Sequence, residues 1–145
     1  MIALVQRVDE AKVVVGNDTI SSIGKGILIL LGINKGDTEQ AARRLAGRCV
    51  QLRIFEDSGG KFNRCLLDVK GAALVVSQFT LVADTSRGRR PSFSDAEEPL
   101  RSKELYELFI ESIRDCKIET GAGIFGERMH IALVNNGPVT IIMEE

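Results

Sequence analysis

One stretch near the middle of the chain constrains both the fold and the position of any functional site. The run Ala72 to Val76 is apolar, which is typical of a buried strand. Ser77, Gln78 and Thr80 then bring two hydroxyls and an amide to the end of this run. A buried hydroxyl or amide without a partner costs about 1–3 kcal/mol. We therefore expect this end of the strand to face a cleft.

The alternation of side chains along a strand limits how these polar groups can act together. Ser77 and Thr80 face opposite sides of an unbroken strand. Both hydroxyls can serve one site only if the chain bends, bulges or ends near Gln78. The alternative is a plain strand whose hydroxyls bond to neighbouring backbone. The heptad Val75 to Leu81 does not decide between the two interpretations.

A polar loop rich in arginine follows the same strand. It runs from Val82 to Pro91 and contains Arg87, Arg89 and Arg90. Binding residues are often carried by loops that a rigid scaffold holds in place. The strand end and this loop are therefore the first candidates for a site.

Size and composition set the class of protein. The 145 residues fit a single domain, residues 1–145, which buries about 68–70% of its unfolded surface without metal or disulfides. The net charge of −1 excludes a protein-wide cationic field, so nucleic-acid binding requires a local patch. No apolar run approaches membrane-spanning length and no leader pattern opens the chain. We expect a cytoplasmic protein without a membrane segment.

The cysteines and the single histidine show no metal-ligand spacing. Cys49, Cys65 and Cys116 are far apart, and no CxxC pair exists. Cys49 lies on an apolar helical stripe and Cys116 near a helix end, so both are interpreted as small core residues. His130 lies in an alternating strand pattern and is interpreted as structural, while a Ser–His or Cys–His pair stays open. The sequence predicts no metal and no cofactor.

Hydrophobic periodicity predicts many strands and two helices. Strands are expected over residues 1–8, 12–15, 19–23, 26–33, 52–55, 72–81, 117–120, 129–134 and 139–143. Asp37 with Gln40 has the form of a capping box, which predicts the start of the first helix. The second helix is expected from Ser102 to Asp115, with a buried stripe formed by Leu105, Leu108, Phe109 and Ile113. The pattern indicates an α+β fold.

The tripeptide Asn136-Gly137-Pro138 stands between the last two predicted strands. Asn-Gly and Gly-Pro are ordinary turn dipeptides, which favours a tight hairpin turn. Only about 5–6% of X–Pro bonds in folded proteins are cis, so the dipeptide alone predicts a trans bond. Gly137 lacks a Cβ and lets a ligand approach the backbone closely.

Together these motifs resemble the D-aminoacyl-tRNA deacylase family, in order and in spacing, over essentially the whole chain. The resemblance is carried by residues 1–8, 77–81, 83–85 with 88–93, and 133–140. Two positions depart from the family: Asn136 stands where many members carry Asp, and Cys65 where Ser is common. Neither touches the central motif residues.

The resemblance implies a homodimeric enzyme with a mixed, mainly antiparallel, barrel-like core and two main helices. It would hydrolyse the ester between a D-amino acid, or mischarged glycine, and the 3′-terminal adenosine of tRNA. It also implies that Gly137-Pro138 is a cis peptide that enters the partner subunit's site and excludes L-aminoacyl groups. The segment Ser77, Gln78, Phe79 and Thr80 would hold the adenosine, with the Phe79 and Thr80 amides as oxyanion donors.

Two other hypotheses stay open. The first is a conventional hydrolase with Ser77 or Thr80 as nucleophile, which needs a base that the sequence does not identify. The second is a non-catalytic RNA-binding module using Arg87, Arg89 and Arg90. Six Phe, one Tyr and no Trp supply few of the stacking aromatics that such modules favour. In an enzyme acting on tRNA, we expect the three arginines to contact phosphates.

Overall fold

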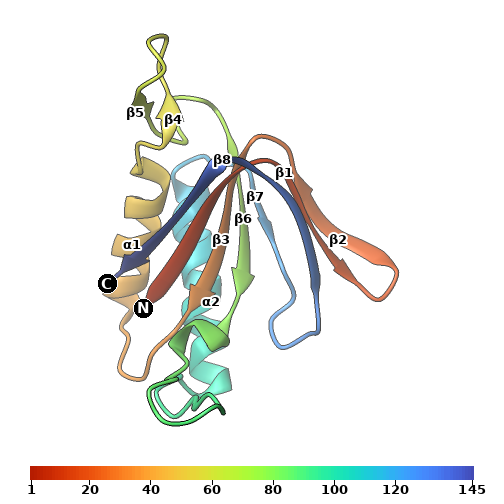
Figure 1. Cartoon of the computed structure of the whole chain (residues 1–145), viewed down its shortest axis with the longest axis vertical. Helices are drawn as coiled ribbons and strands as arrows, with labels where there is room; N and C mark the ends of the chain where they lie inside the picture. The colour runs from red at the N-terminus through yellow and green to blue at the C-terminus, as the bar shows by residue number, and fades with distance from the viewer.

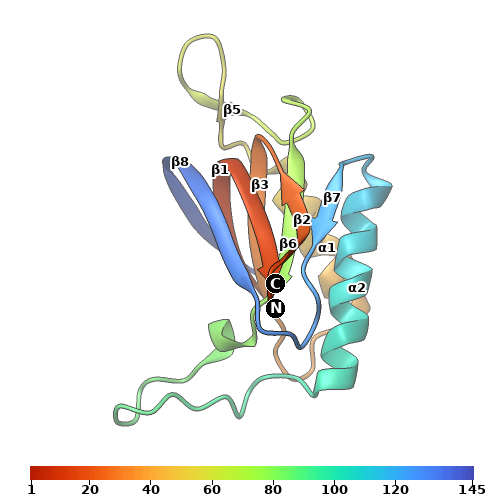
Figure 2. The same cartoon turned by 90° about the vertical axis from the view of Figure 1, so that its right-hand side faces the viewer.

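The computed structural model describes residues 1–145 and shows a curved sheet with two helices against one of its faces (Figures 1 and 2). The elements are β1 (Ile2–Val15), β2 (Asp18–Ile23), β3 (Gly26–Gly32), α1 (Glu39–Gln51), β4 (Phe55–Glu56), β5 (Phe62–Arg64), β6 (Ala72–Ser77), η1 (Phe79–Val82, a 3-10 helix), α2 (Pro99–Asp115), β7 (Thr120–Ala122) and β8 (His130–Glu144). Neither α-helix is long and apolar enough to cross a membrane.

The long strand β1 organises the main sheet, whose order is β2-β1-β3-β6-β7 with β8 also paired to β1. The pairs made by β1 are antiparallel, whereas β3–β6 and β6–β7 are parallel. β1 pairs with β3 through its first half and with β2 through its second, so the sheet curls. Ser21 on β2 lies against Gly121 on β7, where a Cβ would meet its hydroxyl. The predicted mixed, mainly antiparallel, barrel-like α+β fold is confirmed.

Two apolar clusters cover the two faces of this sheet. Ile29 on β3 packs with Leu45 and Phe109 between the sheet and the helices. Leu28, the next residue along β3, packs with Leu74 inside the curl of the sheet. A strand buried on both faces reads as an unbroken apolar run, which explains the sequence of β3 and β6. Each large side chain buried in this way stabilises the fold by about 1.5–3 kcal/mol.

The two helices are confirmed, with changes at their starts. The predicted apolar face of α1 is buried, and it consists of Ala41, Ala42, Leu45, Ala46, Cys49 and Val50. Its N-cap is Thr38, whose hydroxyl accepts from the Ala41 N–H, and not the predicted Asp37. Asp37 instead accepts from the Asn34 N–H at 2.7 Å and closes the preceding turn.

The second helix begins at Pro99, three residues before the predicted start, because proline suits the first helical turn. Its buried residues are Leu105, Tyr106, Phe109, Ile110 and Ile113. Of the predicted stripe, only Leu108 is half-buried instead of buried.

Several predicted strand limits are wrong. Residues 1–8 and 12–15 form one strand, β1. Of residues 52–55 only Phe55 lies in a strand, whereas Phe62–Arg64, expected as a connector, forms β5. The strand predicted at 117–120 starts at Thr120, because Lys117 has a φ of 63° and donates its N–H to Arg114 at the end of α2. The strand predicted over 72–81 ends at Ser77.

Candidate active site

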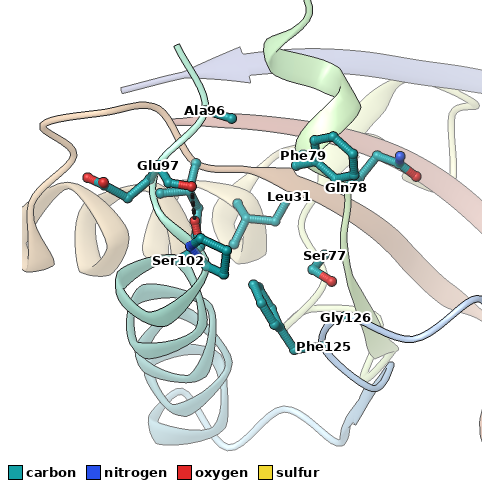
Figure 3. Close-up of a pocket in the computed structure, with 11 residues that line it drawn as sticks. Leu31, Ser77, Gln78, Phe79, Ala96, Glu97, Ser102, Phe125 and Gly126 are labelled. Atoms are coloured by element: carbon teal, nitrogen blue, oxygen red, sulfur yellow. Dashed lines mark hydrogen bonds between the residues drawn. The ribbon is translucent and has the colours of Figure 1, made fainter. Parts of the chain in front are cut away.

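A cavity of about 310 Å³ opens where the parallel strands β3 and β6 end (Figure 3). Its walls come from the strand ends, η1, the segment entering α2 and the loop after β7. The residues that line it are Leu31, Ile33, Ser77, Gln78, Phe79, Ala96, Glu97, Pro99, Ser102, Phe125 and Gly126. Concave sites with mainly apolar walls and a few polar groups are typical of small-molecule binding.

The end of β6 brings the polar residues to this cavity. The Gln78 N–H donates to the Leu31 carbonyl at 2.8 Å, and the chain then leaves the sheet. Gln78 has φ −143° and ψ 77°, and the 3-10 helix η1 follows at Phe79. This is the break near Gln78 that a shared site requires. The cleft-facing strand end predicted from the sequence is therefore confirmed.

The two hydroxyls lie in different surroundings. Ser77 lines the cavity, whereas Thr80 is exposed and does not line it. The Gln78 side-chain amide donates to the Thr80 hydroxyl, and no carboxylate or imidazole bonds to either hydroxyl. The structure therefore shows no nucleophile–base pair at Ser77 or Thr80.

The ionisable groups nearest this site are held elsewhere. Figure 3 shows the Glu97 carboxylate pointing away from Ser77. It accepts from the N–H groups of Glu98 at 2.9 Å and Gly36 at 3.2 Å, and these bonds hold the pKa of Glu97 below its ordinary value. His130 pairs with Val14 on β1 and does not line the cavity. Burial raises the pKa of the Cys49 thiol to about 12, in keeping with a core residue.

Two backbone N–H groups at the start of η1 have no partner along the helix. Its hydrogen bonds begin with the Leu81 N–H, which donates to the Gln78 carbonyl at 3.2 Å. The bonds of a 3-10 helix join each N–H to the carbonyl three residues back. The N–H groups of Phe79 and Thr80, in the first turn, are therefore left free. Two adjacent free amides can donate to one oxygen.

The arginine loop begins beside the cavity. Asp84 and Ser92 exchange two backbone hydrogen bonds, of 2.8 and 2.9 Å, which tie the base of the loop together. The Phe93 ring packs edge-on against Phe79, with ring centroids 5.0 Å apart. Beyond this base the loop extends away from the sheet (Figure 2). It carries the exposed side chains of Arg87, Arg89 and Arg90.

The Gly137–Pro138 peptide is cis, so the trans bond predicted from the dipeptide alone is wrong, and the cis bond implied by the family resemblance is confirmed. The hairpin expected from turn dipeptides is also wrong. β8 is one strand through residues 130–144, and both of its halves pair with β1. The Asn135 side chain accepts from the Val139 N–H at 2.8 Å and donates to the Val139 carbonyl. It thereby closes the base of a bulge formed by residues 136–139.

Sequence analysis missed the residue that holds this bulge, Arg7. Its guanidinium is almost fully buried and donates to the Asn136 carbonyl at 2.8 Å and to the Ile54 carbonyl at 2.6 Å. It also lies 5.1 Å from the centre of the Phe62 ring and 3.8 Å from the Glu56 carboxylate. The one signal was a cation within the apolar first strand.

Within one chain, the bulge and the cavity are far apart. β8, β1, β3 and β6 lie side by side, and three strand spacings amount to about 14 Å. Arg7, opposite the bulge, is level with Ala73, and Ser77 lies about 13 Å further along β6. On a flat sheet, Gly137-Pro138 would lie roughly 19 Å from Ser77. Neither Gly137 nor Pro138 lines the cavity.

Comparisons with known proteins identify relatives over the whole length of the chain. A family model described as D-Tyr-tRNA(Tyr) deacylase matches residues 4–144. A D-aminoacyl-tRNA deacylase of Roseiflexus castenholzii is 56% identical over 99% of this chain and 92% of its own length. That of Aquifex aeolicus is 49% identical over 99% and 97%.

Two solved structures are similar in fold. The c-Myc DNA unwinding element binding protein superposes with a TM-score of 0.94 at 38% identity, covering 100% of this chain and 99% of its own. A probable eukaryotic D-amino acid tRNA deacylase superposes with a TM-score of 0.81 over 99% and 98%, and at 17% identity it supports the fold alone. From the family match and these full-length similarities, the chain belongs to the D-Tyr-tRNA(Tyr) deacylase family.

Proposed function

We propose that this protein is an editing esterase that hydrolyses D-aminoacyl-tRNA and releases the free D-amino acid and tRNA. Two bacterial relatives about half identical to it bear the name D-aminoacyl-tRNA deacylase. The observation that carries the proposal is the cavity at the end of β6, which combines apolar walls with two free amides. Such a site can hold a nucleoside and stabilise an oxyanion without a protein nucleophile.

The terminal adenosine of tRNA is the proposed occupant of the cavity. Phe79 and Phe125 offer aromatic surface for a base, and Ser77 and Gln78 offer polar groups at the strand end. Stacking on an aromatic side chain contributes about 1–3 kcal/mol per base in single-stranded RNA binding. The ester at the 3′ end of the adenosine would then lie beside the Phe79 and Thr80 amides.

Chirality is selected, in this proposal, by Gly137-Pro138 of a second copy of the chain. The separation of roughly 19 Å within one chain means that one ester cannot touch both the cavity and the bulge. In a symmetric dimer, the bulge of each subunit would enter the cavity of the other. An L side chain would collide with this backbone, whereas a D side chain points away and glycine has nothing to exclude. A thousandfold rejection requires only about 4 kcal/mol of differential barrier.

The substrate itself supplies the decisive hydroxyl. The 2′-hydroxyl of the terminal adenosine adjoins the scissile ester and can hold the attacking water against the carbonyl carbon. A group fixed beside the reacting atom has the advantage of intramolecular positioning. No base is bonded to Ser77 or Thr80, so a serine or threonine nucleophile lacks the support that it needs.

Subunit mixing tests the dimeric site. Pro138→Ala removes the filter and a Phe79→Pro change removes an amide donor, so each homodimer should lose stereoselective hydrolysis. Mixed dimers should regain one intact site that combines the two unaltered surfaces. Selectivity that stays absent on mixing, or full activity in a protein that light scattering shows to be monomeric, would refute the filter in trans.

The proposed chemistry is tested with a tRNA that ends in 2′-deoxyadenosine. This substrate should bind normally but be hydrolysed far more slowly than its ribose counterpart. Thr80→Ala and Ser77→Ala should keep appreciable activity. An ester trapped on Thr80, or normal turnover of the deoxy substrate, would restore the nucleophile hypothesis.

A further inference from the structure

The side chain of Asn136, next to Gly137, lies between two opposite charges. Its Oδ1 accepts from the Arg7 Nη2 at 3.3 Å, and its Nδ2 donates to the Asp9 Oδ1 at 2.6 Å. Alternate residues of a strand face the same side, so Arg7 and Asp9 project from one face of β1. They contact the same amide from its two ends.

An amide is the side-chain group that fits this position. It offers an acceptor on one atom and a donor on the other, which matches a guanidinium on one side and a carboxylate on the other. An aspartate at position 136 would bond to Arg7 but would set its second oxygen against the Asp9 carboxylate. Two carboxylates in such contact cannot both stay ionised without cost. Asp9 and Asn136 are therefore matched to each other.

The register of the sheet shows what this contact holds. Gln6 pairs with Thr140 and Val8 with Asn135, so residues 136–139 bulge from β8 opposite Arg7. The Asn135 side chain closes the base of this bulge. Asn136 is the first residue of the bulge, and Arg7 also binds its carbonyl. The orientation of the Asn136 amide is thus coupled to the peptide that leads into Gly137.

Gly137 itself has little freedom to shift independently. Its φ is +143°, a conformation that favours glycine, and a Cβ at this position would come within 2.6 Å of the Val139 side chain and 3.3 Å of the Arg7 guanidinium. A reorientation of Asn136 would therefore be transmitted directly to Gly137.

We propose that Asp9 and Asn136 form a positioning pair that fixes Gly137-Pro138 for the rejection of L-aminoacyl groups. The inference rests on the proposed function, in which this bulge is the chirality filter. Neither residue touches the ester. The pair acts by holding the Asn136–Gly137 peptide in the orientation that places the filter backbone against an L side chain.

The test compares Asn136→Asp with the double variant Asp9→Asn/Asn136→Asp. The measured quantity is the ratio of kcat/KM for D- over L-aminoacyl esters on one tRNA. Because both rates scale with the amount of folded enzyme, this ratio does not depend on a partial loss of folding. Asn136→Asp should lower the ratio by about tenfold, the size of one charged hydrogen bond. The double variant restores an amide facing a carboxylate and should recover most of the loss.

A matched control lies on the β4–β5 hairpin. There the Asn63 amide donates to the Asp57 carboxylate at 3.1 Å, in an equally exposed Asn–Asp pair away from the bulge. Asn63→Asp introduces the same charge and should leave the ratio unchanged. Asp9→Asn alone keeps an acceptor for the Asn136 amide and should lower the ratio by less than Asn136→Asp.

The outcomes separate this inference from the function on which it rests. If the unaltered protein prefers D-aminoacyl-tRNA and Asn136→Asp keeps that preference, the positioning pair is refuted while the proposed function stands. A loss that the double variant does not recover would also refute the pairing. If the unaltered protein shows no preference for D over L, the proposed function fails and the inference fails with it.

Discussion

Replacing Arg7 with methionine should destabilise the protein severely. The buried guanidinium makes hydrogen bonds of 2.8 Å to the Asn136 carbonyl, 2.6 Å to the Ile54 carbonyl and 3.3 Å to the Asn136 side chain. Hydrogen bonds from a charged donor contribute about 1.5–3 kcal/mol each, and a carbonyl left buried without a partner adds a penalty. These terms are not additive, and breaking a buried charged contact typically costs about 3–5 kcal/mol. We expect Arg7→Met to lose that amount, a large share of the usual 5–15 kcal/mol.

Urea unfolding at fixed protein concentration measures the loss, because the stability of a dimer depends on concentration. The transition slope should stay unchanged while the midpoint falls. Arg7→Lys keeps the charge but replaces a fork of donors with one ammonium, so it should lose about half as much. Arg43→Met is the control, since Arg43 is exposed and bonds to nothing, and it should change stability by no more than about 0.5 kcal/mol. A loss below about 1 kcal/mol for Arg7→Met would refute the reasoning.

Three further predictions concern the loop and the cavity. Replacing Arg87, Arg89 and Arg90 together with alanine should weaken tRNA binding and flatten the salt dependence of log K by about 0.7–0.9 per lost contact, whereas an unchanged slope would show that they do not bind phosphates. The N–H groups of Glu98 and Gly36 lower the pKa of Glu97 from its ordinary 4.5, so their stabilising effect is present above that pH and lost as the pH falls through the lowered value. Glu97→Gln should therefore be less stable than the unaltered protein at pH 7 and approach it on acidification, and a constant gap in acid denaturation would contradict this. No group of three or more potential ligand side chains gathers in the structure, so chelation should leave the hydrolysis rate unchanged; a rate that only added Zn²⁺ restores would overturn this.

Local patterns predicted much of the fold. The unbroken runs of β3 and β6 follow from burial on both faces, and the stripe of α1 from its 3.6-residue period. The strand end at Ser77 was also predictable, because two hydroxyls and an amide cannot end a core strand without partners. The limits of β6 and η1 were not, since the bond from Gln78 to Leu31 joins residues far apart in sequence.

The features that sequence analysis missed depend on long-range pairing. β8 continues through Gly137-Pro138 because β1 pairs with it on both sides of the bulge, which local turn propensity cannot show. The role of Arg7 depends on contacts with Ile54 and Asn136, which lie 47 and 129 residues away in the chain. Short motifs locate the strand end and the bulge, but only the sheet register shows that one chain cannot bring them together.

The most direct test measures kcat/KM for one tRNA charged with either enantiomer of the same amino acid, by following the release of the free amino acid. The account predicts hydrolysis of the D-aminoacyl ester well above the uncatalysed rate, with the L-ester at least about a thousandfold slower, which corresponds to about 4 kcal/mol of differential barrier. The same tRNA charged with glycine should be hydrolysed as well. Equal rates for the two enantiomers, or tRNA binding without release of amino acid, would contradict it.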